Sequence, residues 1–118
     1  GSDPKKLFRA IKLANKFGFC EFNLNVGCPS NRVQSGRFGA CLMEEPDIVR
    51  ECLMAMKEAT DKPISVKCRI GVDDMDINSG LDKFIQKISC SGISVFYIHA
   101  RKALLTGLSP RKIAIFLL

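Results

Sequence analysis

The sequence predicts an α/β fold with parallel strands, a fragment of a (β/α)8 barrel made of about three consecutive βα units. Helix-like and strand-like segments alternate along the 118 residues, which is typical of parallel strands joined by helical crossovers. Each strand-like segment has one apolar and one polar face. The polar residues gather toward the end of each segment, where barrel enzymes have their active sites.

The first helix and strand follow from capping and periodicity. Ser2 or Asp3 can cap a helix that has Pro4 in its first turn, and Gly18 ends the pattern. The apolar stripe expected to be buried is Leu7, Ala10, Ile11, Ala14 and Phe17. Residues 19–26 then alternate as a strand, with Phe22, Leu24 and Val26 opposite Glu21, Asn23 and Asn25.

Two further helix–strand units follow. A helix opening at Glu45 and Pro46 is expected to bury Ile48, Val49, Cys52, Leu53 and Met56. Residues 63–71 alternate, with Ile64, Val66, Cys68 and Ile70 opposite Ser65, Lys67 and Arg69. A third helix begins near Asn78 with the stripe Leu81, Phe84, Ile85 and Ile88. The strand at 93–101 sets Phe96, Ile98 and Ala100 against Val95, Tyr97, His99 and Arg101.

The strand faces favour a barrel over an open, doubly wound sheet. Helices cover both faces of a doubly wound sheet, so both faces should be apolar. Here the second face ends in the polar pairs Asn23 and Asn25, Lys67 and Arg69, and His99 and Arg101. In a barrel that face looks inward, and its carboxyl end holds the active site.

Composition sets limits on partners and compartment. The net charge of +6 and pI near 9.2 allow an acidic partner such as RNA, but the basic residues are spread along the chain, and an ordinary basic protein fits equally well. No apolar run is long enough for a membrane span, and no secretory signal opens the sequence. We therefore expect a cytoplasmic protein, with organelle targeting upstream of Gly1 as the open alternative.

The six cysteines and the single histidine predict neither a metal site nor a disulfide framework. Four cysteines fall inside or beside apolar runs and should behave as small hydrophobes, namely Cys20, Cys52, Cys68 and Cys90. Cys28 differs, because it stands in a Gly-Cys-Pro corner at the start of the long loop 27–44. Loops of that length in compact domains are usually functional or disordered, and the interleaved apolar residues favour function.

Three segments resemble the tRNA-dihydrouridine synthase family. They read "NLNVGCPSNRVQSGRFGACLM", "ISVKCRIGVDD" and "YIHARKALLTGLSP", in the family's order and spacing, and the likeness extends to about Pro110. It is closest to the subgroup that modifies D-loop uridines 20 and 20a. The resemblance implies a TIM barrel followed by a helical tRNA-binding domain, with FMN as cofactor, NADPH as reductant and tRNA as substrate. It further implies hydride transfer from the flavin to uracil C6 and protonation of C5 by a cysteine.

The resemblance also assigns residues. It implies Cys28 as the proton donor, a role that suits a thiol with an ordinary pKa of roughly 8.5. Asn25 would hydrogen-bond the uracil, and Lys67 and His99 would contact FMN, with Arg69 lining the same pocket. Arg111 falls where the subgroup has a basic residue that contacts tRNA. Cys41, in the same loop as Cys28, is expected to be small apolar packing.

The resemblance stops near the end of the chain. We expect residues 1–110 to be a partial catalytic domain and residues 111–118, "RKIAIFLL", to be a divergent apolar tail from truncation, altered splicing or a faulty gene model. Ala114 stands where a second arginine contact would be expected. The first two barrel strands with a flavin-contacting glutamine, the later strands around the FMN phosphate, and the tRNA-binding domain would be absent.

Two other functions stay open. One is a different FMN-dependent barrel enzyme acting on a free pyrimidine, such as a dihydroorotate or dihydropyrimidine dehydrogenase. The other is an inactive fragment or weak RNA-binding remnant. The Gly-Cys-Pro corner and "RKALLTGLSP" favour the synthase, and the sequence leaves the oligomeric state open.

Overall fold

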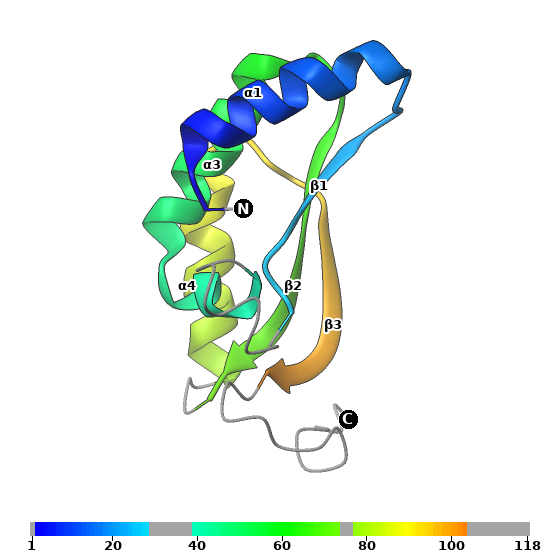
Figure 1. Ribbon diagram of the computed structural model, residues 1–118. Helices are drawn as coiled ribbons and strands as arrows, with labels where there is room; N and C mark the ends of the chain where they lie inside the picture. The colour runs from blue at the N-terminus through cyan, green and yellow to red at the C-terminus, as the bar shows by residue number, and fades with distance from the viewer. Residues whose placement is uncertain (1, 29–38, 74–76, 104–118) are drawn as a thin grey trace.

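The computed structural model describes residues 2–28, 39–73 and 77–103 as one layer of helices on one sheet (Figure 1). The helical segments are α1 (Pro4–Ala14), η1 (Asn15–Phe17), η2 (Gly39–Glu44), α3 (Pro46–Ala59) and α4 (Ile77–Ser89). The strands are β1 (Phe22–Asn25), β2 (Ile64–Val72) and β3 (Phe96–Ala103). The predicted order of helices and strands is thus confirmed.

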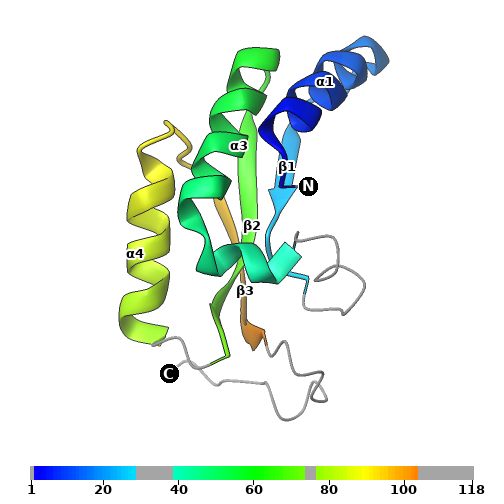
Figure 2. The same cartoon turned by 60° about the vertical axis from the view of Figure 1, so that its left-hand side comes forward.

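The three strands form a parallel sheet in the order β1-β2-β3. Asn25 lies opposite Lys67, and Arg69 lies opposite His99. After β1 ends, the ladder continues through the amide of Val26, which donates to the carbonyl oxygen of Lys67 at 2.8 Å. The helices lie over one face of the sheet (Figure 2), so in the described part the opposite face has no helical cover.

Capping and a change of helix type determine how the chain enters β1. The Asp3 carboxylate, and not the alternative Ser2, caps α1 by accepting the amide N–H groups of Lys5 and Lys6. The α-helix ends at Ala14 and continues as the 3-10 turn η1. A 3-10 helix has three residues per turn instead of 3.6, so η1 rotates the end of the predicted apolar stripe away from the core. Phe17 is consequently 71% exposed, and the expectation that it would be buried is wrong.

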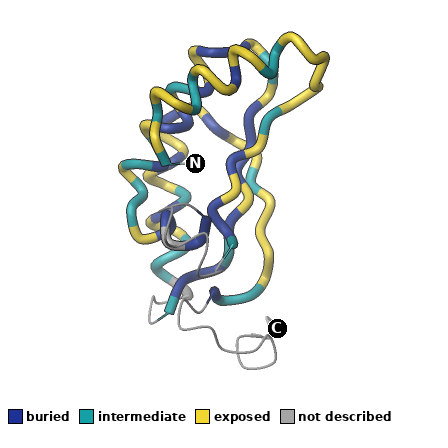
Figure 3. The backbone as a smooth tube through the Cα atoms, in the orientation of Figure 1, coloured by how far each residue is buried: buried dark blue, intermediate teal, exposed yellow. Residues whose placement is uncertain are grey.

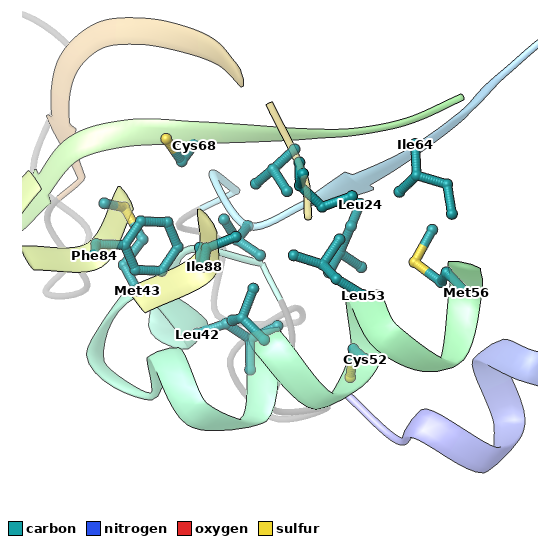
Figure 4. Packing of buried hydrophobic residues seen from close by; sticks show 14 of the residues in the cluster. Leu24, Leu42, Met43, Cys52, Leu53, Met56, Ile64, Cys68, Phe84 and Ile88 are labelled. Carbon is teal, nitrogen blue, oxygen red and sulfur yellow. The ribbon is translucent and has the colours of Figure 1, made fainter. Parts of the chain in front are cut away.

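The core lies between the helices and the covered face of the sheet (Figures 3 and 4). Its fully buried residues come from Val26 just after β1, from β2, from η2 and from the inner sides of α3 and α4. They include Val26, Leu42, Met43, Val49, Cys52, Leu53, Met56, Val66, Cys68, Ile70, Phe84 and Ile88. The predicted inner sides of α3 and α4 are therefore confirmed at their central positions.

Five further residues that were expected to be buried are exposed. Ala10 is exposed because it lies on the outer side of α1. Ile98 is 44% exposed and Ala100 is also exposed, because no described helix follows β3 to cover its apolar face. Cys20 and Cys90 are exposed because they lie in the connections that precede β1 and follow α4. Apolar neighbours in the sequence therefore did not ensure the burial of Cys20 and Cys90.

Two cysteines are true core thiols. Cys52 on α3 and Cys68 on β2 are fully buried, and burial raises the pKa of each thiol to about 11. The folded chain thus holds these protons more tightly than the unfolded chain does.

Folding stability should therefore fall as the pH rises from about 9 toward 11. The unfolded state gains stability by losing thiol protons that the folded state still keeps. Urea unfolding followed by circular dichroism at pH 8, 9, 10 and 11, roughly spanning this window, measures the effect. Cys68→Ala, which removes one of the two groups, should show a smaller loss across the same window. An equal loss in both proteins would contradict the assignment.

Candidate active site

A cavity of about 210 Å³ opens beside the sheet where β1 ends. It is formed by the end of β1, the corner that follows it, the middle of β2 and the middle of β3. The lining residues are Asn25, Gly27, Cys28, Lys67, Cys68, Arg69 and His99. The strand register explains this gathering, because Asn25 pairs with Lys67 and Arg69 pairs with His99.

The corner that contains Cys28 is held by hydrogen bonds from two strands and a later segment. The amide of Gly27 donates to Oδ1 of Asn25 at 2.8 Å, and Nε of Arg69 donates to the Gly27 carbonyl oxygen at 3.0 Å. The Cys28 carbonyl oxygen accepts from the amide of Ala40 at 2.7 Å. Cys28 is therefore fixed in place, although it lies beyond the last residue of β1.

Asn25 has a fixed orientation as a result. Its side-chain oxygen accepts the Gly27 N–H, so the amide group cannot rotate without losing that bond. Its Nδ2 has no hydrogen-bond partner among the described residues and can donate to a ligand in the cavity.

The cavity is electropositive. Lys67, Arg69 and His99 line it, Arg101 lies close by on β3, and none of the lining residues that the structure describes is acidic. The Arg69 Nη1 atom is buried without a hydrogen-bond partner in the described part of the chain. Desolvation lowers the pKa of Arg69, and the nearby Arg101 lowers it further, against an opposing effect of Cys28. A ligand with carbonyl oxygens or negative charge would satisfy this unpaired donor.

The environment of His99 favours its neutral form, because it lowers the pKa of the imidazole. Although its side chain is exposed, desolvation on the sheet lowers its pKa, and the charges of Arg69, Arg101 and Lys67 lower it further. A neutral imidazole keeps one donor and one acceptor nitrogen, so His99 can hydrogen-bond either kind of group.

The cysteines near the cavity differ in how accessible they are. Cys28 is half-buried at the cavity, whereas the thiol of Cys68 is buried and has a raised pKa. Cys41 belongs to η2 by its backbone.

The described residues contain no group of three His, Cys, Asp or Glu side chains that could hold a metal ion. They also contain no helix that is long and apolar enough to cross a membrane.

Four of the five predicted site residues meet at this cavity, namely Asn25, Cys28, Lys67 and His99. The fifth, Arg111, and also Ala114, lie outside the described residues. Sequence reasoning placed Arg69 in the pocket but missed its bond to Gly27. The place of Arg69 in the pocket followed from its position on the same strand face as Lys67, two residues away, but that pattern carries no information about the bond.

Comparisons with known proteins agree on one family. A family model described as dihydrouridine synthase matches residues 1–113. The chain is 55% identical over 112 residues to a tRNA-dihydrouridine(20/20a) synthase of Shewanella oneidensis and 56% identical over 113 residues to one of Vibrio cholerae. Each alignment covers 95% of this chain and 33% or 35% of the relative. The chain thus spans about a third of the length of the curated relatives it matches.

The imidazole of His99 should titrate below the ordinary histidine value of 6.5. His99 is the only histidine, so its proton resonances can be followed by NMR across the pH range without ambiguity. Arg101→Gln removes a neighbouring positive charge and should raise the pH midpoint of the His99 titration. Lys83→Gln on α4 should leave that midpoint unchanged. Because the unfolded chain binds this proton more tightly, protonation at low pH should also reduce folding stability. A midpoint at or above 6.5 would contradict the described electrostatics.

Proposed function

Because the chain belongs to the dihydrouridine synthase family, we propose that it forms the uracil-binding and proton-donating part of a tRNA-dihydrouridine synthase. The reaction is reduction of uridine to 5,6-dihydrouridine in the tRNA D-loop, at positions 20 and 20a as in the named relatives. The observation that supports this most directly is the meeting of Cys28 with Asn25, Lys67 and His99 in one cavity.

In this proposal Cys28 gives a proton to C5 of the uracil ring. Reduction of the C5–C6 double bond adds a hydride at C6 and a proton at C5, so the protein must supply an acid at one carbon. Cys28 is half-buried at the cavity, and the bonds to Gly27 and to its own carbonyl oxygen hold its backbone. After Cys28 has given up its proton, the positive charge of Arg69 stabilises the Cys28 thiolate.

Asn25 orients the uracil in this site. Its oxygen is occupied by the Gly27 amide, so the side chain offers N–H donors to the ligand. We assign it to a uracil carbonyl oxygen. This narrows the expectation from sequence, in which Asn25 hydrogen-bonds the uracil, to a donor role for its side chain.

FMN and NADPH are the proposed cofactor and reductant. FMN, when bound, supplies the hydride, and NADPH restores its reduced form. Lys67 and His99 would contact the flavin ring, and the unpaired Nη1 of Arg69 and the absence of acidic lining residues suit a group that gains negative charge on reduction. The cavity is smaller than the roughly 300–1,000 Å³ of typical ligand sites. The described residues therefore form part of an FMN site.

The remaining assignments concern tRNA and chain organisation. We assign Arg111 to contact with tRNA, residues 1–110 to a partial catalytic domain, and residues 111–118 to a divergent tail. We place the activity in the cytoplasm, where its tRNA substrate is available.

The proton donor is tested in a chimera in which this chain replaces the matching third of the Shewanella oneidensis relative. Cys28→Ala should reduce dihydrouridine formation by about a hundredfold or more, because a positioned general acid contributes roughly 10²–10⁴-fold. Product is measured by mass spectrometry of digested tRNA after single-turnover reaction.

Cys41→Ala is the matched control, since it removes a thiol from the same loop and should keep near-normal activity. A Cys28→Ala chimera that retains the wild-type rate would contradict the role of Cys28. A wild-type chimera that reduces free uracil or orotate without RNA would favour the alternative dehydrogenase class.

The chain on its own should bind little flavin. Purified protein is expected to lack the yellow absorbance of bound FMN, because the cavity is below the size of a typical cofactor site. The chimera is expected to be yellow, and Lys67→Ala within it should weaken FMN retention on dialysis. A stoichiometric FMN complex of the isolated chain would show that the described residues suffice.

A further inference from the structure

The net charge of the chain is concentrated in one helix on the outside of the fold. Residues 4–17 contain five of the 18 basic residues and none of the 12 acidic ones, so they carry +5 of the net charge of +6. The rest of the chain is nearly neutral, with thirteen basic and twelve acidic residues. The sequence-based view that positive charge is merely dispersed is therefore incomplete.

The five cations form a basic face on α1 and η1, composed of Lys5, Lys6, Arg9, Lys12 and Lys16. All five side chains are exposed. Lys5, Arg9, Lys12 and Lys16 recur at intervals of four, three and four residues, which sets one cation on each successive turn, about 5.4 Å apart along the axis.

No described acidic group neutralises this basic face. None of its five residues forms an ion pair within the described ranges, and the nearest acid in sequence, Asp3, is engaged in capping the amides of Lys5 and Lys6. α3 differs, because it mixes Asp47, Glu51 and Glu58 with its basic residues. Lys87 on α4 is paired with Asp47.

The basic face points away from the rest of the fold. The apolar side of α1, with Ile11 buried and Leu7 and Phe8 partly buried, packs toward the core beside α3. Figure 2 shows α1 at the edge of the helical layer, with its other long side uncovered by the described elements. In Figure 1 most of α1 lies toward the end of the sheet where the strands begin, away from the cavity.

We propose that this basic face of α1 binds the phosphate backbone of the tRNA, at a point separate from the reacting base. The inference rests on the proposed function for the identity of the RNA. A row of cations without acidic partners on successive turns complements a polyanion, from which binding releases condensed counterions. An anionic membrane is disfavoured, because a membrane-surface helix needs a free apolar side and that side of α1 packs in the core.

The test compares two triple variants of equal charge. Lys5→Gln/Arg9→Gln/Lys16→Gln removes three cations from the basic face, and Lys62→Gln/Lys83→Gln/Lys87→Gln removes three from other elements. Glutamine is a good helix former, so α1 should persist, as circular dichroism can verify. Binding of a fluorescent tRNA transcript is measured by anisotropy at several salt concentrations. The full chain and the Shewanella chimera are both used, so the result does not depend on the solubility of the chain alone.

The α1 variant should bind tRNA about tenfold more weakly at low salt, and its slope of log K against log[salt] should shrink by about 2–3, as expected for three lost phosphate contacts. The control variant should keep most of the affinity and slope. Equal weakening in both variants would overturn the proposal, because it would reflect net charge alone. Binding of the wild type, but not the α1 variant, to phosphatidylserine vesicles with tRNA binding unaffected would also overturn it, in favour of a membrane.

Failure of this inference can be distinguished from failure of the proposed function. If the function is wrong, the wild-type chimera makes no dihydrouridine, while the salt-dependent difference between the two variants is still measurable. If the α1 inference is wrong, the two variants bind tRNA alike, whatever the chimera produces.

Discussion

The parallel register of the three strands is the constraint on which both the core and the cavity depend. Side chains alternate between the two faces of a strand, and the helices cover only one face in the described part. The pairing that buries Val66 and Cys68 under the helices therefore turns Lys67 and Arg69 to the opposite face. A slip of one residue would exchange the two sets, placing cations in the core.

Burial divides the cysteines of this sheet into two chemical classes. Cys68 lies on β2 beside the cavity, yet its thiol is buried and holds its proton to high pH. Cys28 lies beyond the end of β1, where Arg69 and Ala40 fix its backbone and leave the residue partly accessible. β1 thus supports the corner that follows it, and in that corner Cys28 is accessible to a ligand. This division suits a site whose reactive group must meet a ligand in one orientation.

Alternation and helical periodicity predicted the fold class, which the parallel sheet and the family membership confirm. Strand parity also predicted that Asn25, Lys67, Arg69 and His99 share one side of the sheet, and all four line the cavity. Cys28 lies beyond β1, so the resemblance and not parity singled it out. Alternation and periodicity failed where tertiary context decides: Phe17 turns outward at a 3-10 turn, and Ile98 has no described helix above it. The bond between Arg69 and Gly27 joins residues 42 positions apart, so no local pattern could reveal it.

If Asn25 contacts the uracil as proposed, the hydrogen bond from the Gly27 amide to Asn25 would affect discrimination between bases. An amide free to rotate could present its oxygen to the amino group of cytosine as readily as its nitrogen to a uracil carbonyl. With the oxygen held by Gly27, rotation would break a bond within the corner that carries Cys28. A cytosine amino group would then face an N–H donor, leaving polar groups unpaired, which is how buried sites reject close analogues. Under the proposed role of Asn25, the same contact that shapes the cysteine corner would favour a pyrimidine with a carbonyl at that edge.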